Sequence, residues 1–462
     1  MTLRRQVLRG GLVLAMRQSL GVVVGVIGVL LLTRSIGPGQ YGLFAAALGL
    51  VGYLQSLSTW GVNVYLIRRE EAPSDQIYDV ATTLLFLTSA GVTLAALLAL
   101  PLIEAWLRIP EFGTLGAAMF VSLPVVVCAQ VPLARLERAL EYGRVATIEL
   151  TGQLVFYLVA LPFAYRGVGA WAPVVGWWAQ QVISAVATFA ASRYRPRVGW
   201  NRLQAKEMAA YGLGFSASTW VWQLRNLVNP MVVGRYLGAE AMGYVALTIR
   251  IVDVLSFVKA ATWRLSIAAL GQLRREASRF ARIVVEGMQL QVLAVGPILV
   301  AFGVLAPMAV PRFFGARWQA VPGIYPYIAL SYLANSLFNL HSSALYVLRR
   351  NWDVTLFHWA HVFLFAGAAL LLVPRLGVRG YGMAEIAALP SYLVIQHLLV
   401  RQVGRVQGLV PLCWGLAFGV ALFASLGHWW LLGALPVVLL WPSARRALVD
   451  LTRNVVQVLY AS

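Results

Sequence analysis

Long apolar runs separated by short polar segments dominate the hydrophobic pattern of the chain. Most runs are about 20 residues long, the length with which an α-helix crosses the hydrocarbon core of a bilayer, and they lack the alternation of membrane β-strands. The pattern predicts an all-α polytopic membrane protein with about 14 transmembrane helices. The predicted spans lie near residues 12–33, 43–66, 80–103, 113–134, 146–165, 168–191, 209–233, 244–270, 283–310, 322–348, 354–373, 379–400, 409–426 and 429–441.

A short motif of one arginine and two glycines stands between two apolar runs in each half of the chain. Its copies are Arg34, Gly37 and Gly42 and, 201 positions later in each case, Arg235, Gly238 and Gly243. Glycines at this spacing after a helix end predict a tight hairpin between two membrane helices. The recurrence predicts a six-helix N-terminal lobe (1–200), a six-helix C-terminal lobe (201–408), and a two-helix appendage with a cytoplasmic tail (409–462).

The composition agrees with a membrane protein. The chain is 60% hydrophobic and 12% charged, whereas soluble domains carry about 25% charged residues. The two cysteines lie inside apolar runs, so we expect neither a disulfide framework nor a zinc site. The first apolar run is too long for the core of a signal peptide, and we expect no cleavable one.

The distribution of Lys and Arg over the loops predicts the orientation. With the N-terminus in the cytoplasm, 24 of these residues fall on the cytoplasmic side and 8 on the opposite side. Both termini are then cytoplasmic, and an even number of spans in each half makes the two repeats parallel. The net charge of +20 follows from this bias and from anionic headgroups, so no nucleic-acid partner is expected.

A few charged residues lie inside the predicted spans, where an unpaired charge is costly and is retained mainly beside a wet cavity or a partner. The basic ones are Arg17, Arg225, Arg250, Lys259 and Arg264. Arg17 and Arg264 lie near cytoplasmic helix ends, where extension to the headgroups is an equal alternative. Arg225 and Arg250 lie deeper.

The eighth span carries one polar stripe, because Arg250, Asp253 and Arg264 share a helix face and Lys259 points to the opposite side. Arginine side chains with few carboxylates favour an anionic ligand such as a phosphate or diphosphate. Asp253 and Glu385 are the candidates for coupling to a proton or cation. The short loops leave no room for a catalytic domain, no phosphate-binding loop is present, and we expect no cofactor, metal or enzymatic activity.

The stretch from Leu32-Thr33-Arg34 through Gly37 and Gly42 to Gly61-Val-Asn-Val-Tyr-Leu-Ile-Arg68-Arg69 resembles the polysaccharide-biosynthesis flippases of the multidrug/oligosaccharidyl-lipid/polysaccharide (MOP) exporter superfamily. These translocate O-antigen and exopolysaccharide repeat units. The resemblance covers the whole chain in span count and is most specific over residues 12–70. It implies two six-helix lobes that form a V, alternating access, and a place in the bacterial inner membrane.

The resemblance also implies a substrate and a site. The substrate would be an oligosaccharide on undecaprenyl diphosphate, moved from the cytoplasmic to the periplasmic leaflet, with the polysaccharide polymerase machinery and membrane lipids as partners. Basic residues on the first, seventh and eighth helices would correspond to Arg17, Arg225, Arg250 and Arg264.

Two alternatives remain. A MATE-like drug or cation antiporter of the same superfamily favours acidic cavity residues, and the basic excess within these spans argues against it. A membrane glycosyltransferase or polymerase acting on lipid-linked glycans generally needs a sizeable extracytoplasmic loop with acidic residues, and the loops on that side are short.

Overall fold

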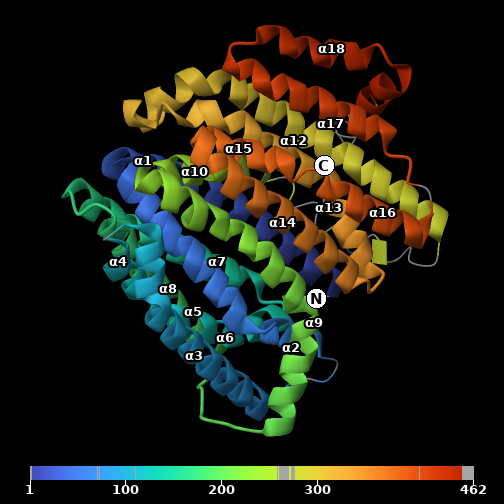
Figure 1. The fold of residues 1–462 in the computed structure, drawn as a ribbon. Helices are drawn as coiled ribbons and strands as arrows, with labels where there is room; N and C mark the ends of the chain where they lie inside the picture. The colour runs from blue at the N-terminus through green and yellow to red at the C-terminus, as the bar shows by residue number, and fades with distance from the viewer. Residues whose placement is uncertain are drawn as a thin grey trace. The chain divides into compact units, whose positions relative to one another are not determined.

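The computed structural model describes residues 3–69, 71, 73–109, 111–257, 259, 270–271, 276–404 and 406–449; the side chains of residues 3–19, 214–215 and 277 are not among those described. Within these ranges the chain is almost entirely helical, which confirms the predicted fold class. The chain forms two compact units, Met1–Gly243 and Tyr244–Ser462 (Figure 1).

The helices of the first unit follow each other with short connections. They are α1 (Leu3–Thr59), α2 (Val62–Arg68), α3 (Asp75–Leu107), α4 (Phe112–Phe120), α5 (Leu123–Cys128), α6 (Gln130–Arg138), α7 (Tyr142–Tyr165), α8 (Trp171–Ser192), α9 (Arg202–Val228), the π-helical turn η1 (Asn229–Gly234) and the first part of α10 (Arg235–Leu255).

The second unit holds the remainder of α10 and the later helices. They are α12 (Ala277–Phe314), η2 (Ala316–Trp318), α13 (Val321–Val347), α14 (Asn351–Leu376), α15 (Val378–Ala387), α16 (Ser391–Val403), α17 (Leu409–Leu422), η3 (Phe423–Leu426), η4 (Trp429–Gly433) and α18 (Ala434–Leu439).

Nine helices of the described part are long and apolar enough to cross a membrane, and ten if the bent pair Trp429–Leu439 and Pro442–Val449 counts as one span. α9, α10 and α13 are not among them, although each overlaps a predicted span. α1 contains the first predicted span and most of the second, whose last residues lie in α2. The count of 14 therefore stays a prediction, as do the two parallel repeats.

α7 and α8 form an antiparallel helical hairpin that connects the two ends of the first unit. The turn between them uses Gly167 and Gly169 at φ 79° and 65°, in the left-handed region that glycine enters without steric cost. Along the hairpin the helices approach closely, because a Cβ on Gly176 would lie 2.7 Å from the carbonyl oxygen of Phe156. Small residues of this kind let membrane helices pack backbone to backbone.

α9 packs with the first unit. The indole of Trp220 donates to the carbonyl of Ser56 on α1 at 2.7 Å, and Gly212 lies so near Trp60 that a Cβ there would overlap the Trp60 carbonyl oxygen. The contacts therefore divide the chain at Gly243. The lobe boundary predicted at residue 200 is a different division and stays a prediction.

The loops that follow α6 and α13 share one backbone conformation, 209 positions apart. Leu140 and Arg349 both adopt left-handed backbone angles, with φ 56° and 59°. The Leu140 amide donates to the Glu137 carbonyl at 3.0 Å, and the Arg349 amide donates to the Tyr346 carbonyl at 3.1 Å. Arg108 and Arg193 adopt the same left-handed conformation after α3 and α8, so the internal repeat stays a prediction.

Candidate functional site

The recurring motif has the same backbone geometry in both copies. Gly37 interrupts α1 with φ 77° and ψ 173°, and Gly238 interrupts α10 with φ 81° and ψ −174°. These angles lie in a region that is essentially restricted to glycine. The first glycine of each copy therefore allows a sharp break in a helix that continues on both sides.

The second glycines of the motif form a reciprocal contact. A Cβ on Gly42 would overlap the carbonyl oxygen of Ala239, and a Cβ on Gly243 would overlap the carbonyl oxygen of Pro38. Ala239 stands 201 positions after Pro38, so each motif contacts the other through equivalent atoms. The two motifs meet backbone to backbone, with no room for a side chain at either glycine.

The arginines of the two motifs differ in their surroundings. Arg235 donates to the carbonyl of Trp106 at 2.9 Å, and its guanidinium lies 5.1 Å from the centroid of the Trp106 ring. The Trp106 indole in turn donates to the Met231 carbonyl at 2.8 Å. Arg235 thus fastens the end of α3 to the start of α10, while Arg34 is exposed.

The predicted basic residues fall in different parts of the structure. Arg225 is half-buried on α9, and its guanidinium carbon lies 5.7 Å from the centroid of the Trp222 ring. Arg250 is exposed on α10 in the second unit. The side chain of Arg17, and Arg264 altogether, lie outside the described residues.

The two predicted coupling carboxylates have opposite environments. Asp253 is exposed on α10, and among the described residues no ion pair joins it to Arg250. Glu385 on α15 is fully buried and accepts a hydrogen bond of 2.7 Å from the Ser331 hydroxyl of α13. Coupling to a proton or cation through either residue stays a prediction.

Lys259 is held by α13. Its ammonium donates to Asn335 Oδ1 at 2.9 Å and lies 4.8 Å from the centroid of the Tyr332 ring. Ser331 and Asn335 lie one helical turn apart, so the same face of α13 contacts both Glu385 and Lys259. The sequence identified Glu385 and Lys259 as charges within spans but gave no sign of these partners.

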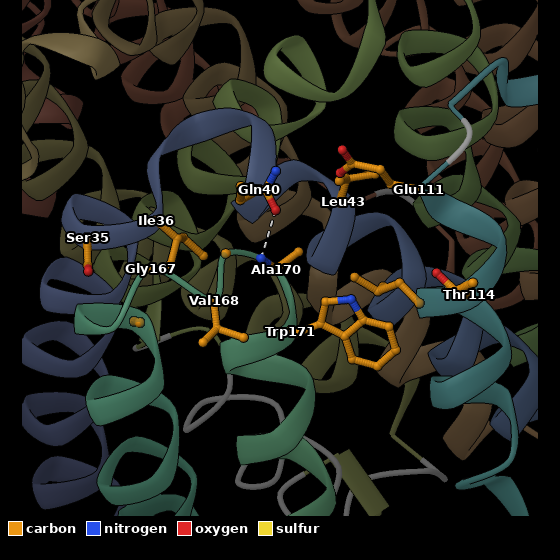
Figure 2. Close-up of a pocket in the computed structure, with 13 residues that line it drawn as sticks. Ser35, Ile36, Gln40, Leu43, Glu111, Thr114, Gly167, Val168, Ala170 and Trp171 are labelled. Carbon is orange, nitrogen blue, oxygen red and sulfur yellow. Dashed lines mark hydrogen bonds between the residues drawn. The ribbon is translucent and has the colours of Figure 1, made fainter.

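A pocket of about 480 Å³ opens where the turn between α7 and α8 meets the motif of α1 (Figure 2). We call it the Gln40 pocket. Its lining includes four polar side chains and one indole: Ser35, Gln40, Glu111, Thr114 and Trp171. The amide of Ala170 donates to Gln40 Oε1 at 2.8 Å, so Gln40 connects α1 to the turn.

A second pocket, of about 280 Å³, lies at the opposite end of the same helical hairpin. We call it the Arg193 pocket, and its charged lining consists of Arg135, Glu141, Arg144 and Arg193. Arg144 pairs with Glu141 at 2.6 Å, and Arg135 pairs with Asp75 at 2.9 Å. Three guanidinium groups against one lining carboxylate leave this pocket positively charged.

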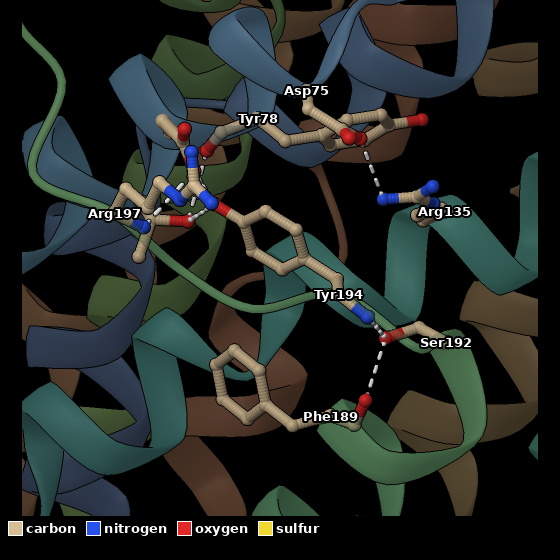
Figure 3. Close-up of polar contacts among 9 residues, drawn as sticks. Asp75, Tyr78, Arg135, Phe189, Ser192, Tyr194 and Arg197 are labelled. Atoms are coloured by element: carbon tan, nitrogen blue, oxygen red, sulfur yellow. Dashed lines mark hydrogen bonds and ion pairs between the residues drawn. The ribbon is translucent and has the colours of Figure 1, made fainter.

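A polar cluster fixes the segment after α8 beside the Arg193 pocket (Figure 3). The Tyr194 hydroxyl donates to Asp79 Oδ1 at 2.8 Å, and the Arg197 backbone amide donates to the same oxygen at 3.0 Å. Burial, with the neighbouring Asp79 carboxylate as a lesser contribution, raises the pKa of Tyr194 well above its ordinary value. The guanidinium of Arg135 lies 5.9 Å from the Tyr194 ring centroid.

No three His, Cys, Asp or Glu side chains gather into a metal-binding group in the described part of the chain. Both cysteines are free thiols.

Sequence comparison places the chain among proteins of polysaccharide biosynthesis. It is 22% identical over 312 residues to the succinoglycan biosynthesis transport protein ExoT of Rhizobium meliloti (strain 1021), which covers 65% of this chain but only 61% of ExoT. It is 22% identical over 408 residues to the lipopolysaccharide biosynthesis protein WzxC of Escherichia coli (strain K12), with 86% and 80% of the two chains covered.

Solved structures share the fold. The lipid II flippase MurJ in an inward closed conformation matches with a TM-score of 0.72 and 12% identity, over 96% of this chain and 100% of MurJ. An inward-facing multidrug resistance MATE family transporter of the MOP superfamily matches with a TM-score of 0.63 and 14% identity, over 84% and 98% of the two chains. None of these names denotes an enzyme, in agreement with the sequence-based expectation.

The family described as polysaccharide biosynthesis protein matches residues 31–322, a stretch that begins just before the first copy of the glycine motif and extends through the second. These residues are more than half of the chain and include both pockets. The fold is shared with MurJ and with the MATE family transporter, in agreement with the predicted all-α membrane architecture. The chain is a multi-pass membrane protein and belongs to the polysaccharide biosynthesis protein family.

Proposed function

We propose that this protein is a flippase that moves oligosaccharide repeat units linked to undecaprenyl diphosphate from the cytoplasmic to the periplasmic leaflet of a bacterial inner membrane. The observation that carries the proposal is the family match over residues 31–322. A relative named as a succinoglycan biosynthesis transport protein and a structural neighbour named as a lipid II flippase also support the proposed flippase function.

The physical need for such a protein lies in the headgroup of the substrate. A diphosphate with hydroxyl-rich sugars cannot cross hydrocarbon at an acceptable free-energy cost, whereas a polyprenyl tail is soluble in it. A path through the protein therefore has to carry the headgroup while the tail remains in lipid. Alternating access, as in other transporters built from two repeats, would provide that path.

The basic residues within the spans would hold the diphosphate. Arg225 supports this role best, because its side chain is half-buried on α9, within the predicted seventh span, and its guanidinium lies beside Trp222. A permanent charge at such a position is retained mainly for a partner or a wet cavity. Arg17, Arg250 and Arg264 are the further candidates, since a single guanidinium binds phosphate oxygens through two parallel N–H donors.

Energy coupling would use Glu385, with Asp253 as the second candidate. Burial of Glu385 and its hydrogen bond from Ser331 support a carboxylate that exchanges a proton or binds a cation during transport. Both termini would lie in the cytoplasm, and the polymerase that consumes the flipped unit would act on the other side.

A drug or cation antiporter is the second candidate, because a multidrug transporter of the MOP superfamily shares the fold. Its ligands are not anionic lipids, so it does not require Arg225. Replacement of Arg225 therefore separates the two functions.

The test is complementation of cells that lack the protein with Arg225→Ala and Arg250→Ala, with Arg312→Ala as the control. Arg312 is exposed at the end of α12 and has no part in the proposal. We expect the first two variants to reach the membrane at normal levels and to lose glycan assembly, while the control retains it. Full assembly with both Arg225→Ala and Arg250→Ala would show that these residues do not hold the diphosphate.

A further inference from the structure

The Gln40 pocket has a lining that the residues assigned to the diphosphate do not share. Its polar groups are the hydroxyls of Ser35 and Thr114, the amide of Gln40 and the carboxylate of Glu111, and it has no lysine or arginine. A pocket with one negative charge and no positive charge repels a diphosphate. The lining therefore favours a neutral ligand or a cation over a diphosphate.

Gln40 is held in a fixed orientation. Its Oε1 accepts a hydrogen bond of 2.8 Å from the Ala170 amide, which leaves its Nε2 hydrogens to act as donors elsewhere. The turn is shaped to admit this side chain, because a Cβ on Gly169 would lie 2.7 Å from Gln40 Oε1 and the glycine has φ 65°. The donor is thus preorganised, which lowers the entropy cost of binding a ligand.

Trp171 supplies an aromatic surface on the same pocket. It is the first residue of α8, its side chain is 41% exposed, and Figure 2 shows its indole between the turn and the Thr114 side of the pocket. A tryptophan near a helix end often serves only as an anchor at the membrane interface. This one also lines a pocket with four hydrogen-bonding side chains.

We propose that the Gln40 pocket binds a neutral, hydroxyl-rich saccharide. The Gln40 amide would donate to hydroxyl oxygens, the Glu111 carboxylate would accept from neighbouring hydroxyls, and the Trp171 ring would cover the apolar face of a sugar ring. The volume of about 480 Å³ falls in the range of small-molecule sites, about 300–1,000 Å³. A single carboxylate with hydroxyls and an amide provides too little charge for a tight divalent-cation site.

The place of this pocket in transport rests on the proposed function. By the predicted orientation the turn between α7 and α8 lies on the extracytoplasmic side, so the pocket would receive the sugars as they leave the membrane path. It would thereby discriminate among glycans at the point of release, separately from the arginines that recognise the diphosphate common to all such lipids.

The experiment measures binding to the purified full-length protein by ligand-observed NMR, which does not depend on transport. The probe is the oligosaccharide repeat unit released by partial hydrolysis of the cell's own surface polysaccharide, with sodium pyrophosphate as a competitor. We expect saccharide binding that pyrophosphate does not displace, and a loss of affinity of about 3- to 10-fold in Trp171→Ala.

Three further variants test the contacts assigned to Gln40 and Trp171 and provide a control. Gln40→Glu can still accept from the Ala170 amide but loses the Nε2 donors, so it should fold and bind more weakly; Trp171→Phe should retain most of the affinity. Trp429→Ala is the matched control, because Trp429 is 56% exposed at a helix start and lines neither described pocket.

Each outcome decides the proposal. Equal binding by wild type, Trp171→Ala and Gln40→Glu would overturn it, as would no binding to wild type or displacement of the saccharide by pyrophosphate. Saccharide binding without any effect of depletion on lipid-linked glycans would contradict the proposed function but leave the pocket assignment standing. Glycan accumulation on depletion without saccharide binding would do the reverse.

Discussion

The two pockets at the ends of the α7–α8 hairpin have opposite chemistry. α7 has 24 residues and is about 36 Å long, so the pockets lie roughly a bilayer core apart. The Gln40 pocket is lined by one carboxylate, an amide, two hydroxyls and an indole, whereas the Arg193 pocket is lined by three arginines and one glutamate. One helical hairpin thus carries a weakly negative site at one end and a positive site at the other.

Under the predicted orientation the Arg193 pocket lies on the cytoplasmic side, and topology alone would account for its basic charge. Arginines at one end of a hairpin are what the positive-inside rule predicts for cytoplasmic loops, where they attract anionic headgroups. The other end is free of that constraint, so its polar residues need a different explanation. A binding role for the Gln40 pocket is accordingly more specific than one for the Arg193 pocket.

The largest expected effect comes from Gly42→Ala, which should deform the Gln40 end of the first unit and leave the Arg193 end intact. The new methyl group would overlap the Ala239 carbonyl and displace the segment that carries the pocket residues Gln40 and Leu43, at a cost on the order of 1–3 kcal/mol. Thermal unfolding of the purified protein measures the loss. Gly39→Ala is the matched control, since a Cβ there meets nothing within 4 Å.

The two glycine variants also test the pockets separately. Gly42→Ala should weaken saccharide binding and leave the lipid content at the Arg193 end unchanged. Equal stability of Gly42→Ala and Gly39→Ala would contradict the backbone contact between the two motifs.

A second, smaller effect is expected from the double variant Arg144→Gln with Arg193→Gln. Each basic residue near an anionic surface contributes about 1 kcal/mol of attraction to anionic lipids. The double variant should retain fewer anionic phospholipids after purification, as native mass spectrometry would measure, while Gln40→Glu retains the wild-type number. If the arginine variant keeps its full set of anionic lipids, the positive charge of the Arg193 pocket does not determine how many anionic lipids the protein binds.

The smallest effect is expected from Tyr194→Phe, which tests how the Arg193 end is held. The change removes the hydroxyl contacts to Asp79 and Thr82, at a cost on the order of 1 kcal/mol near neutral pH. Burial raises the pKa of Tyr194, so the fold favours the neutral phenol. Its contribution is complete below the ordinary tyrosine pKa of about 10 and decreases as the pH rises above it.

Thermal unfolding between pH 7 and pH 11 measures this dependence. Wild type should lose stability above about pH 10, and Tyr194→Phe should lose less over the same range. Parallel curves for the two proteins would mean that ionisation of Tyr194 does not oppose the fold.

The sequence predicted the membrane fold because apolar runs of helical length leave a strong pattern. The turn at each glycine motif could also be predicted from the sequence, because essentially only glycine adopts the backbone angles seen at Gly37 and Gly238. The reciprocal contact of Gly42 with Ala239 was not predicted, although the constant spacing of 201 positions contained a sign of it.

The pockets and the partner of the buried Glu385 could not be predicted, because the side chains that meet there are distant in the sequence. Gln40 and Ala170 are 130 positions apart, and Ser331 and Glu385 are 54 apart. Such contacts depend on how helices pack, and single helices carry no periodic signal for them. The sequence therefore identified charged residues within spans but not the partners that decide their role.

We propose that the protein flips lipid-linked repeat units. Mass spectrometry of lipid-linked glycans from cells depleted of the protein tests it most directly. We expect undecaprenyl diphosphate bearing a complete repeat unit to accumulate, and the mass of that species would identify the cargo. Accumulation of truncated units would indicate a glycosyltransferase instead, and an unchanged glycan pool would contradict the flippase and favour a drug exporter.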